Sequence, residues 1–388
     1  MTVSDSPTDY PGDGDVPPPE IVVAAQRGAA SQWRLMWWQF RRHRLAIVSA
    51  GVLLLIYLVA AFCEFLAPFS PTAFTPRYTY APPQALHFFD RDDAGDMIFR
   101  PHVFGYKVTI DPEALRRTFV IDRSIKYPVG FFVPSEPYKM WGLITLETKA
   151  FGPLNRGDPM YLLGADRLGR DMLSRIMYGT RISMSIGLIG VTLSLLLGVV
   201  LGGISGYYGG WVDNAIQRTV EFVLSLPTTP LWLGLAAAMP TNWPPLRIYL
   251  AITIILSLVG WTSLARVVRG RFLSLRTEDF VTAARLDGAR ERRIIFRHMV
   301  PSFVSHIIAE VSLAIPGMIL AETALSFLGL GLQPPLVSWG VLLQEAQNIR
   351  AIATAPWLFA PGVAVVIAVL VLNFVGDGLR DAADPYGQ

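Results

Sequence analysis

The most constraining feature of this sequence is a series of long apolar runs. Each run is close to the roughly 20 residues that an α-helix needs to cross the ~30 Å hydrocarbon core of a membrane. Hydrophobic residues make up 52% of the chain and charged residues 16%, a balance that excludes an ordinary soluble domain. We therefore predict an all-α polytopic membrane protein with six transmembrane helices. The runs are 45–67, 182–203, 216–239, 246–268, 302–325 and 357–375.

Two segments precede the first span. Residues 1–30 are rich in Pro, Asp and Gly, and they predict a disordered cytoplasmic tail. Residues 31–44 alternate Trp and Phe with Arg, a mixture suited to lipid headgroups. This second segment predicts an interfacial elbow helix that leads into the first span at 45–67.

The segment at 68–181 separates the first two spans and has mixed polarity. It holds all four lysines, but long loops cross a membrane regardless of their charge, so it can lie outside. The stretches 107–110 and 131–133 have the composition of short strands. We predict an external loop or small periplasmic domain here, between helices 1 and 2.

The remaining spans form a predicted core at 182–380, followed by a short cytoplasmic tail at 381–388. Nine arginines lie between Arg266 and Arg297, at the loop between the fourth and fifth spans. Because basic residues accumulate in cytoplasmic loops, this loop should face inward, and six spans then place both termini inside. Gly198, Gly202 and Gly206 recur every four residues and predict a face for close helix packing.

The inner loop at 269–301 reads as a helix, a turn and a second helix. Thr277 is a predicted N-cap, and Glu278 and Asp279 place negative charge in the first turn. Gly288 stands where a helix end favours a left-handed residue. A second helix over 289–298 would lead to a proline at position 301 that can open the next span, and Ala283 with Ala284 would allow close approach of a partner.

The spacing of Thr282-Ala283-Ala284, Gly288 and Pro301 resembles the EAA loop of ABC importer permeases. In that family the loop docks on a cytoplasmic ATPase and transmits its motion. This chain has Thr282 where the family often has Glu, and His298 and Val300 where it prefers Ile and Leu; Glu278 could supply the acid. An ordinary arginine-rich inner loop of another membrane protein is the alternative. The resemblance implies an ATPase-coupling role for Glu278, Asp279, Thr282, Ala283, Ala284, Asp287, Gly288 and Pro301.

Two further stretches resemble the dipeptide/oligopeptide C-type permease subunits. They are LLGADRLGRDMLSRIMYGTRIS at 162–183 and GDGLRDAADP at 376–385. In the first, we interpret Asp166, Arg170, Asp171 and Arg175 as a structural network of ion pairs and helix caps, because paired charges are usually structural. A metal or substrate site is the alternative interpretation.

Acidic residues within apolar runs are costly and usually face a cavity or a partner. Glu310 is therefore the candidate for the translocation pathway, although burial against another helix would also explain it. We expect Glu322 near the outer surface, and Glu64 to have a structural role at the outer end of the first span.

No catalytic or nucleotide-binding motif is present in the sequence. A phosphate-binding loop needs Gly-Lys-Ser/Thr, and none of the four lysines follows glycine or precedes Ser or Thr. HExxH and GxSxG motifs are also absent. We expect no catalytic residue, cofactor or metal in this chain, so ATP and Mg²⁺ would be bound by a separate ATPase.

The resemblance implies the type I ABC importer permease fold and a subunit that forms half of a pathway for dipeptides or oligopeptides. Its expected partners are a homologous second permease subunit, one or two ATPase subunits, an external substrate-binding protein and membrane lipid, with no nucleic acid. The expected location is the bacterial inner membrane. Oligosaccharides or nickel are alternative cargoes. An ion-coupled secondary transporter would need paired intramembrane acids and usually an inverted repeat; a membrane-embedded enzyme and a scaffold subunit are further alternatives.

Overall fold

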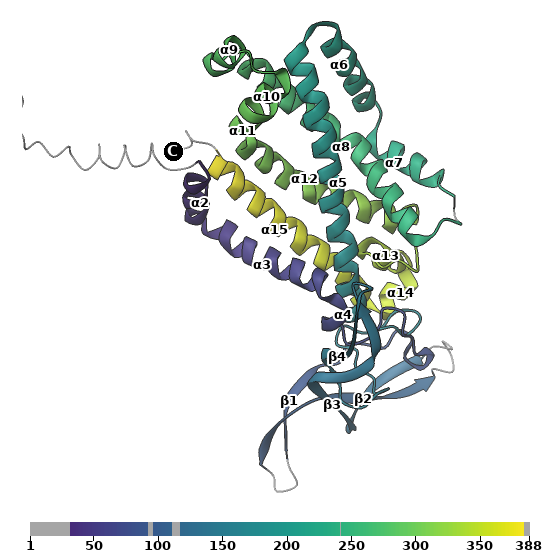
Figure 1. Cartoon of the computed structure of the whole chain (residues 1–388). Helices are drawn as coiled ribbons and strands as arrows, with labels where there is room; N and C mark the ends of the chain where they lie inside the picture. The colour runs from purple at the N-terminus through teal and green to yellow at the C-terminus, as the bar shows by residue number, and fades with distance from the viewer. Residues whose placement is uncertain (1–31, 92–95, 111–116, 241, 384–388) are drawn as a thin grey trace, which may run out of the picture.

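The computed structural model describes residues 32–91, 96–110, 117–240 and 242–383 (Figure 1). The predicted tail at 1–30 and residues 384–388 of the other tail lie outside these ranges. Helices make up most of the described chain, and a single β-sheet lies at one end of the helical body, opposite the short helices α9 and α10 (Figure 1).

Five helices are long and apolar enough to cross a membrane, or up to six if the bent pair α6 and α7 forms one span. Four of them are α3 (Arg44–Ala61), α5 (Met172–Tyr208), α8 (Pro245–Leu275) and α12 (Val304–Phe327), and the fifth joins η4 (Pro356–Phe359) to α15 (Ala360–Ala383).

The bent pair consists of α6 (Gly210–Ser225) and α7 (Thr228–Ala237), which meet at 84°. Pro227 lies at the break, where it lacks the N–H that would continue the helical hydrogen bonds. Pro230 falls in the first turn of α7, where a missing N–H costs little. The run predicted at 216–239 is therefore interrupted, and its first helix begins earlier than the hydrophobic pattern indicates.

The N-terminal helix α2 (Gln32–Arg42) is separated from α3 by His43, whose imidazole Nδ1 accepts a hydrogen bond from Ala46 N. Phe40 of α2, Ala46 of α3 and Ala382 of α15 belong to one buried cluster. The start and the end of the described chain thus lie side by side (Figure 1).

Helices α5 and α8 form the tightest pair of the helical body. A Cβ atom at Gly206 would lie 2.7 Å from the carbonyl oxygen of Arg269, and one at Gly198 would lie 2.9 Å from the Cβ of Leu264. Both distances are shorter than ordinary contacts, so glycine is required for this approach. Around the pair, Ile186, Leu256 and Ile319 are fully buried in the main apolar core.

The segment between α4 and α5, predicted to be external, forms one antiparallel sheet in the order β1-β2-β3-β4. The strands are β1 (Leu86–Arg91), β2 (Met97–Ile110), β3 (Arg117–Met140) and β4 (Ile144–Pro153). They are much longer than the short strands predicted from sequence. One part of β3 pairs with β2, and the other part pairs with β4.

Helix α5 begins at Met172, ten residues before the span predicted at 182–203. Arg175 and Arg181 occupy helical positions there but interrupt the apolar pattern, so the hydrophobic run does not indicate this early start. The N-terminal end of α5 therefore extends beyond its most apolar stretch toward the sheet.

A group of short helices follows α12, consisting of α13 (Trp339–Leu343), η3 (Gln344–Gln347) and α14 (Ile349–Thr354). The carboxylate of Glu322 attaches this group to α12. It accepts hydrogen bonds from the hydroxyls of Ser326 at 2.8 Å, Ser338 at 2.7 Å and Ser183 at 3.3 Å. Glu322 is fully buried among α5, α12 and α13, near the C-terminal end of α12.

Candidate coupling surface and external charge network

The predicted coupling loop contains helix α9 (Asp279–Leu286). Its N-cap is Glu278, which makes no side-chain capping bond. Thr277 instead donates its hydroxyl to the carbonyl oxygen of Ser274 at 2.9 Å, at the end of α8, so the prediction of Thr277 as the N-cap is wrong.

Helix α9 ends in the way that the sequence predicts. Gly288 has a φ of +72°, in the left-handed region. Its N–H donates to the carbonyl of Arg285, and the N–H of Ala289 donates to the carbonyl of Ala284, both at 3.0 Å. This pair of bonds satisfies carbonyls that the helix end leaves open, and it reverses the chain direction sharply.

The two faces of α9 have different surroundings. Val281 and Ala284 are buried in a cluster that includes Phe272 of α8 and Phe303 beside α12. Ala284 therefore packs against the chain's own core, and only Ala283 of the two alanines is open to a partner. The outward face is exposed and carries Thr282, Ala283, Leu286, Asp287 and Gly288.

The segment after Gly288 is not the single α-helix predicted at 289–298. It consists of α10 (Glu291–Arg293), the π-helical turn η2 (Ile294–Met299) and α11 (Val300–Ser302), which contains Pro301. A π turn inserts extra backbone into a helical path and often marks a functional position. Here it lets Ile294 and Met299 both reach the buried cluster below α9.

Side chains connect the loop to the neighbouring turn between α5 and α6. The guanidinium of Arg269 binds both carboxylate oxygens of Asp213, at 2.6 and 2.5 Å. The guanidinium of Arg285 lies 5.4 Å from the ring centroid of Tyr207. The hydroxyl of Tyr208 donates to Glu291 at 2.8 Å. Within the described ranges, Arg269 is the only one of the nine arginines from Arg266 to Arg297 that forms an ion pair.

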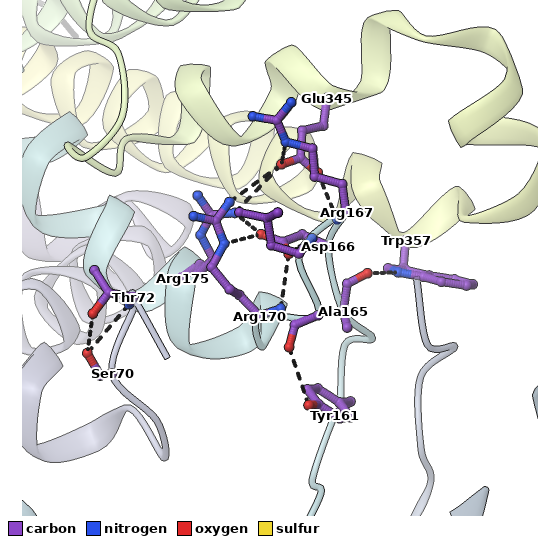
Figure 2. Close-up of polar contacts among 12 residues, drawn as sticks. Ser70, Thr72, Tyr161, Ala165, Asp166, Arg167, Arg170, Arg175, Glu345 and Trp357 are labelled. Atoms are coloured by element: carbon purple, nitrogen blue, oxygen red, sulfur yellow. Dashed lines mark hydrogen bonds and ion pairs between the residues drawn. The ribbon is translucent and has the colours of Figure 1, made fainter. Parts of the chain in front are cut away.

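The Asp/Arg cluster lies at the opposite end of the helical body, next to the sheet, which we call the sheet end (Figure 1, Figure 2). Asp166 is fully buried, and its carboxylate accepts the Arg170 Nε at 2.6 Å and a close contact from an Arg175 guanidinium nitrogen. Backbone N–H groups of Leu168 and Arg170 also donate to it, at 2.8 and 3.0 Å. The structure thus brings Asp166, Arg170 and Arg175 together.

Glu345 of η3 completes this cluster, and sequence reasoning missed it. Its carboxylate lies 3.4 Å from Arg167, 3.7 Å from Arg170 and 3.9 Å from Arg175 (Figure 2). Burial raises the pKa of Glu345, and the nearby Asp166 carboxylate adds to the rise. Glu345 is far from the arginines in sequence and belongs to no motif with them, so no local signal could have revealed it.

Asp171 differs from the other three predicted members. It forms no ion pair within the described ranges, and its Oδ2 accepts hydrogen bonds from the backbone N and hydroxyl of Ser174, at 2.7 and 2.6 Å. It is therefore the N-cap of α5. Burial raises the pKa of its carboxyl to about 6, although the bonds from Ser174 oppose that rise.

A second ion pair joins the first span to α5. Arg181 binds both carboxylate oxygens of Glu64, which lies in α4 (Cys63–Leu66), and donates to the carbonyl of Ala60 at 2.8 Å. Lys149 of β4 donates to the carbonyl of Glu64 at 2.5 Å. Burial acts to raise the pKa of Glu64, but the hydrogen bonds from Arg181 lower it below its usual value.

Glu310, the pathway candidate, lies on a partly exposed face of α12. Its side chain is 39% exposed, and a carboxylate oxygen lies 3.9 Å from the His306 ring. Ala314 and Gly317 are exposed further along this face. Their spacing places both residues on one stripe of α12 with Glu310. The small size of Ala314 and Gly317 would allow this stripe to line a path or to pack against another helix. Over the described ranges, no group of three or more His, Cys, Asp or Glu side chains is arranged to hold a metal ion.

Comparisons with known proteins identify the family. Residues 198–386 match the family model described as binding-protein-dependent transport system inner membrane component. Residues 31–83 match the N-terminal TM domain of oligopeptide transport permease C. A dipeptide transport system permease protein of Alkalihalophilus pseudofirmus is 38% identical over 62% of this chain and 76% of its own length. The chain belongs to this family of ABC importer permeases.

Other relatives of the permease carry related names. A glutathione transport system permease protein of Pectobacterium atrosepticum is 40% identical over 60% of this chain and 75% of its own length. An oligopeptide transport system permease protein of Haemophilus influenzae is 39% identical over 58% and 70%. Its family and its five or six apolar helices give the permease the type I ABC importer fold, with an added sheet. The two family models leave residues 84–197 unmatched, a stretch that contains the whole sheet.

Proposed function

We propose that this permease forms half of the translocation pathway of an ATP-driven importer for dipeptides or oligopeptides in the bacterial inner membrane. Its partners would be a second, homologous permease subunit, one or two ATPase subunits that bind ATP and Mg²⁺, and an external substrate-binding protein. Both termini would be cytoplasmic. The names of the relatives support a peptide cargo, because they include dipeptide, oligopeptide and glutathione permeases.

The observation that carries the coupling proposal is the two-sided character of α9. Val281 and Ala284 fix one face in the chain's own core, whereas Ala283 and Leu286 on the other face are exposed, Leu286 at 84%. An exposed apolar and small-residue surface on a rigid base suits docking by another protein.

A displacement of α9 would be transmitted to two spans through packed side chains. Val281 and Ala284 contact the cluster that holds Phe272 near the inner end of α8 and Phe303 at the start of α12. Because a packed core does not deform continuously, movement of α9 would shift these helix ends together. ATP binding by the partner would thereby favour one of two orientations of the pathway.

The coupling proposal is tested with Ala283→Arg in the purified importer. Ala283 is exposed on α9, so arginine fits the fold of the permease itself but obstructs close docking. We expect loss of co-purifying ATPase and at least a tenfold fall in ATP-driven dipeptide uptake into proteoliposomes, since about 1.4 kcal/mol of lost docking energy is a factor of ten.

Two variants control for the substitution. Ala353→Arg makes the same change at an exposed alanine of α14 on the external side, and Ala283→Ser keeps a small side chain at the docking position. Both should retain the ATPase and transport. Normal uptake by Ala283→Arg would refute the coupling role of α9. ATP-driven uptake of nickel or an oligosaccharide instead of a dipeptide would replace the cargo, and uptake driven by an ion gradient alone would support the secondary transporter.

A further inference from the structure

The external region contains a cavity that the transport function does not explain. It has a volume of about 440 Å³, within the range of small-molecule sites. Its walls come from the segment 68–78, from β3 and β4, from residues 153–161 and from the start of α5. The cavity therefore lies where the sheet meets the outer ends of the spans.

Asp171 is one of the residues that line this cavity, and one of its carboxylate oxygens has no partner among the described residues. Asp171 is only 4% exposed, and while its Oδ2 caps α5 through Ser174, its Oδ1 accepts no hydrogen bond from the described residues. A buried carboxylate oxygen without a donor is costly, and a ligand that brings an N–H group would remove that cost.

The other walls favour an organic ammonium group as that donor. The rings of Tyr78 and Tyr161 line the cavity, with centroids 5.5 Å apart, and aromatic faces attract cations. A metal ion is a poorer fit, because Asp171 belongs to no group of three or more His, Cys, Asp or Glu side chains within the described ranges.

The same cavity offers positive groups for a carboxylate. Lys149 is 5% exposed and lines the cavity, and its ammonium donates to the Glu64 carbonyl and lies 4.0 Å from the Tyr138 ring centroid. An ammonium has three N–H donors, so N–H groups of Lys149 remain for a ligand after the bond to the Glu64 carbonyl is made. Arg156 also lines the cavity, and one of its guanidinium N–H groups donates a hydrogen bond to the carbonyl of Ser135.

We propose that this cavity binds a small zwitterion, a free amino acid or short peptide, with its ammonium group on Asp171 and its carboxylate on Lys149 or Arg156. The site lies outside the membrane-spanning helices, so the inference goes beyond transport along the pathway. It adds an external binding site on the permease itself, separate from the substrate-binding protein and from the ATPase.

The test is calorimetric titration of the full-length permease in detergent with the dipeptide dialanine. Asp171→Asn is the informative variant, because the amide oxygen can still cap α5 while the NH₂ group replaces the free Oδ1 and repels an ammonium. We expect at least a tenfold loss of affinity, which is the scale of a charge-assisted hydrogen bond. N-acetyl-dialanine, which lacks the ammonium, should bind the wild-type chain at least tenfold more weakly than dialanine.

Asp122→Asn is the matched control. The Asp122 carboxylate also accepts hydrogen bonds from the backbone N–H and the hydroxyl of a nearby serine, Ser124, but it is only half-buried on β3 and does not line the cavity. The affinity of the Asp122→Asn variant for dialanine should equal that of the wild type. The inference fails if the wild type does not bind millimolar dialanine, if Asp171→Asn binds it normally, or if the acetylated peptide binds equally well. ATP-driven dipeptide uptake in the assembled importer reports separately on the proposed function.

Discussion

The carboxylate of Asp166 at the sheet end is fully buried and pairs with Arg170 and Arg175, whereas those of Asp279 and Asp287, at the start and the C-cap of α9, are exposed. Neither of the two α9 carboxylates has an ion-pair partner in the described part of the chain. The arginines differ in the same way, since those around Asp166 share a second carboxylate, that of Glu345, whereas most of those near α9 have none.

This contrast separates two uses of charge in one molecule. Paired and buried charges fix the geometry of the segments they join, because removing one partner leaves the other uncompensated. Exposed, unpaired charges contribute little to the fold and remain available to a partner of opposite sign. The charges at the sheet end therefore fix the local geometry, and those at the α9 end leave a surface that fits the proposed docking of a partner.

The largest expected effect is on the free energy of unfolding, when an aspartate is replaced by asparagine at each of the two ends. Asp166→Asn should lower the free energy of unfolding by about 3–5 kcal/mol, because it leaves the buried Arg175 and the half-buried Arg170 guanidinium groups without a full counter-charge. Asp279→Asn should change it by less than about 1 kcal/mol, since the residue is exposed in the first helical turn. Denaturant unfolding in detergent measures both. Equal losses would remove the contrast between the ends.

A smaller effect is expected at the turn that ends α9. Gly288→Ala places a side chain at a φ of +72° and should destabilise the 277–299 segment locally by about 1–2 kcal/mol. Hydrogen–deuterium exchange should show faster opening of that segment with little change in the sheet. Gly270→Ala is the control, because a Cβ also meets open space there but the backbone is helical. Faster exchange throughout the sheet end would show that the two ends are not independent.

The smallest effect concerns the pH dependence of stability and should be confined to the sheet end. The raised pKa of Asp171, about 6 against an ordinary value of 3.8, means that the folded chain binds this proton more tightly than the unfolded chain. The stability contributed by this group therefore rises as the pH falls from 7 to 5, by about 1 kcal/mol. Asp171→Asn should lack that rise in paired unfolding measurements at the two pH values. An identical pH dependence in both chains would contradict it.

The helical part of the fold was largely accessible from sequence, because a membrane span must be long and apolar. The break at Pro227 was also predictable from the missing N–H. The long strands were not. β3 contains Pro128, Pro134 and Pro137, which argue against a continuous strand, and the structure accommodates the latter two at a register shift between Pro134 and Tyr138.

The candidate sites show the same division between local and distant signals. The left-handed Gly288 follows from local helix geometry and is confirmed. The orientation of Ala284 could not be derived, because the side of a short amphipathic helix that meets the core depends on what lies beneath it. The partner role of Glu345 and the free oxygen of Asp171 depend on contacts between distant segments, for which the sequence has no pattern.

The 24-residue strand β3 has a mechanical consequence. At about 3.3 Å per residue, such a strand covers up to roughly 80 Å of contour, with no connecting loop along its length. Hydrogen bonds tie one part of it to β2 and the other to β4, and β4 is anchored through Lys149 to Glu64 beside the first span. A force applied to the far tip of the sheet would therefore be transmitted along β3 toward the first span, because no flexible loop interrupts this strand.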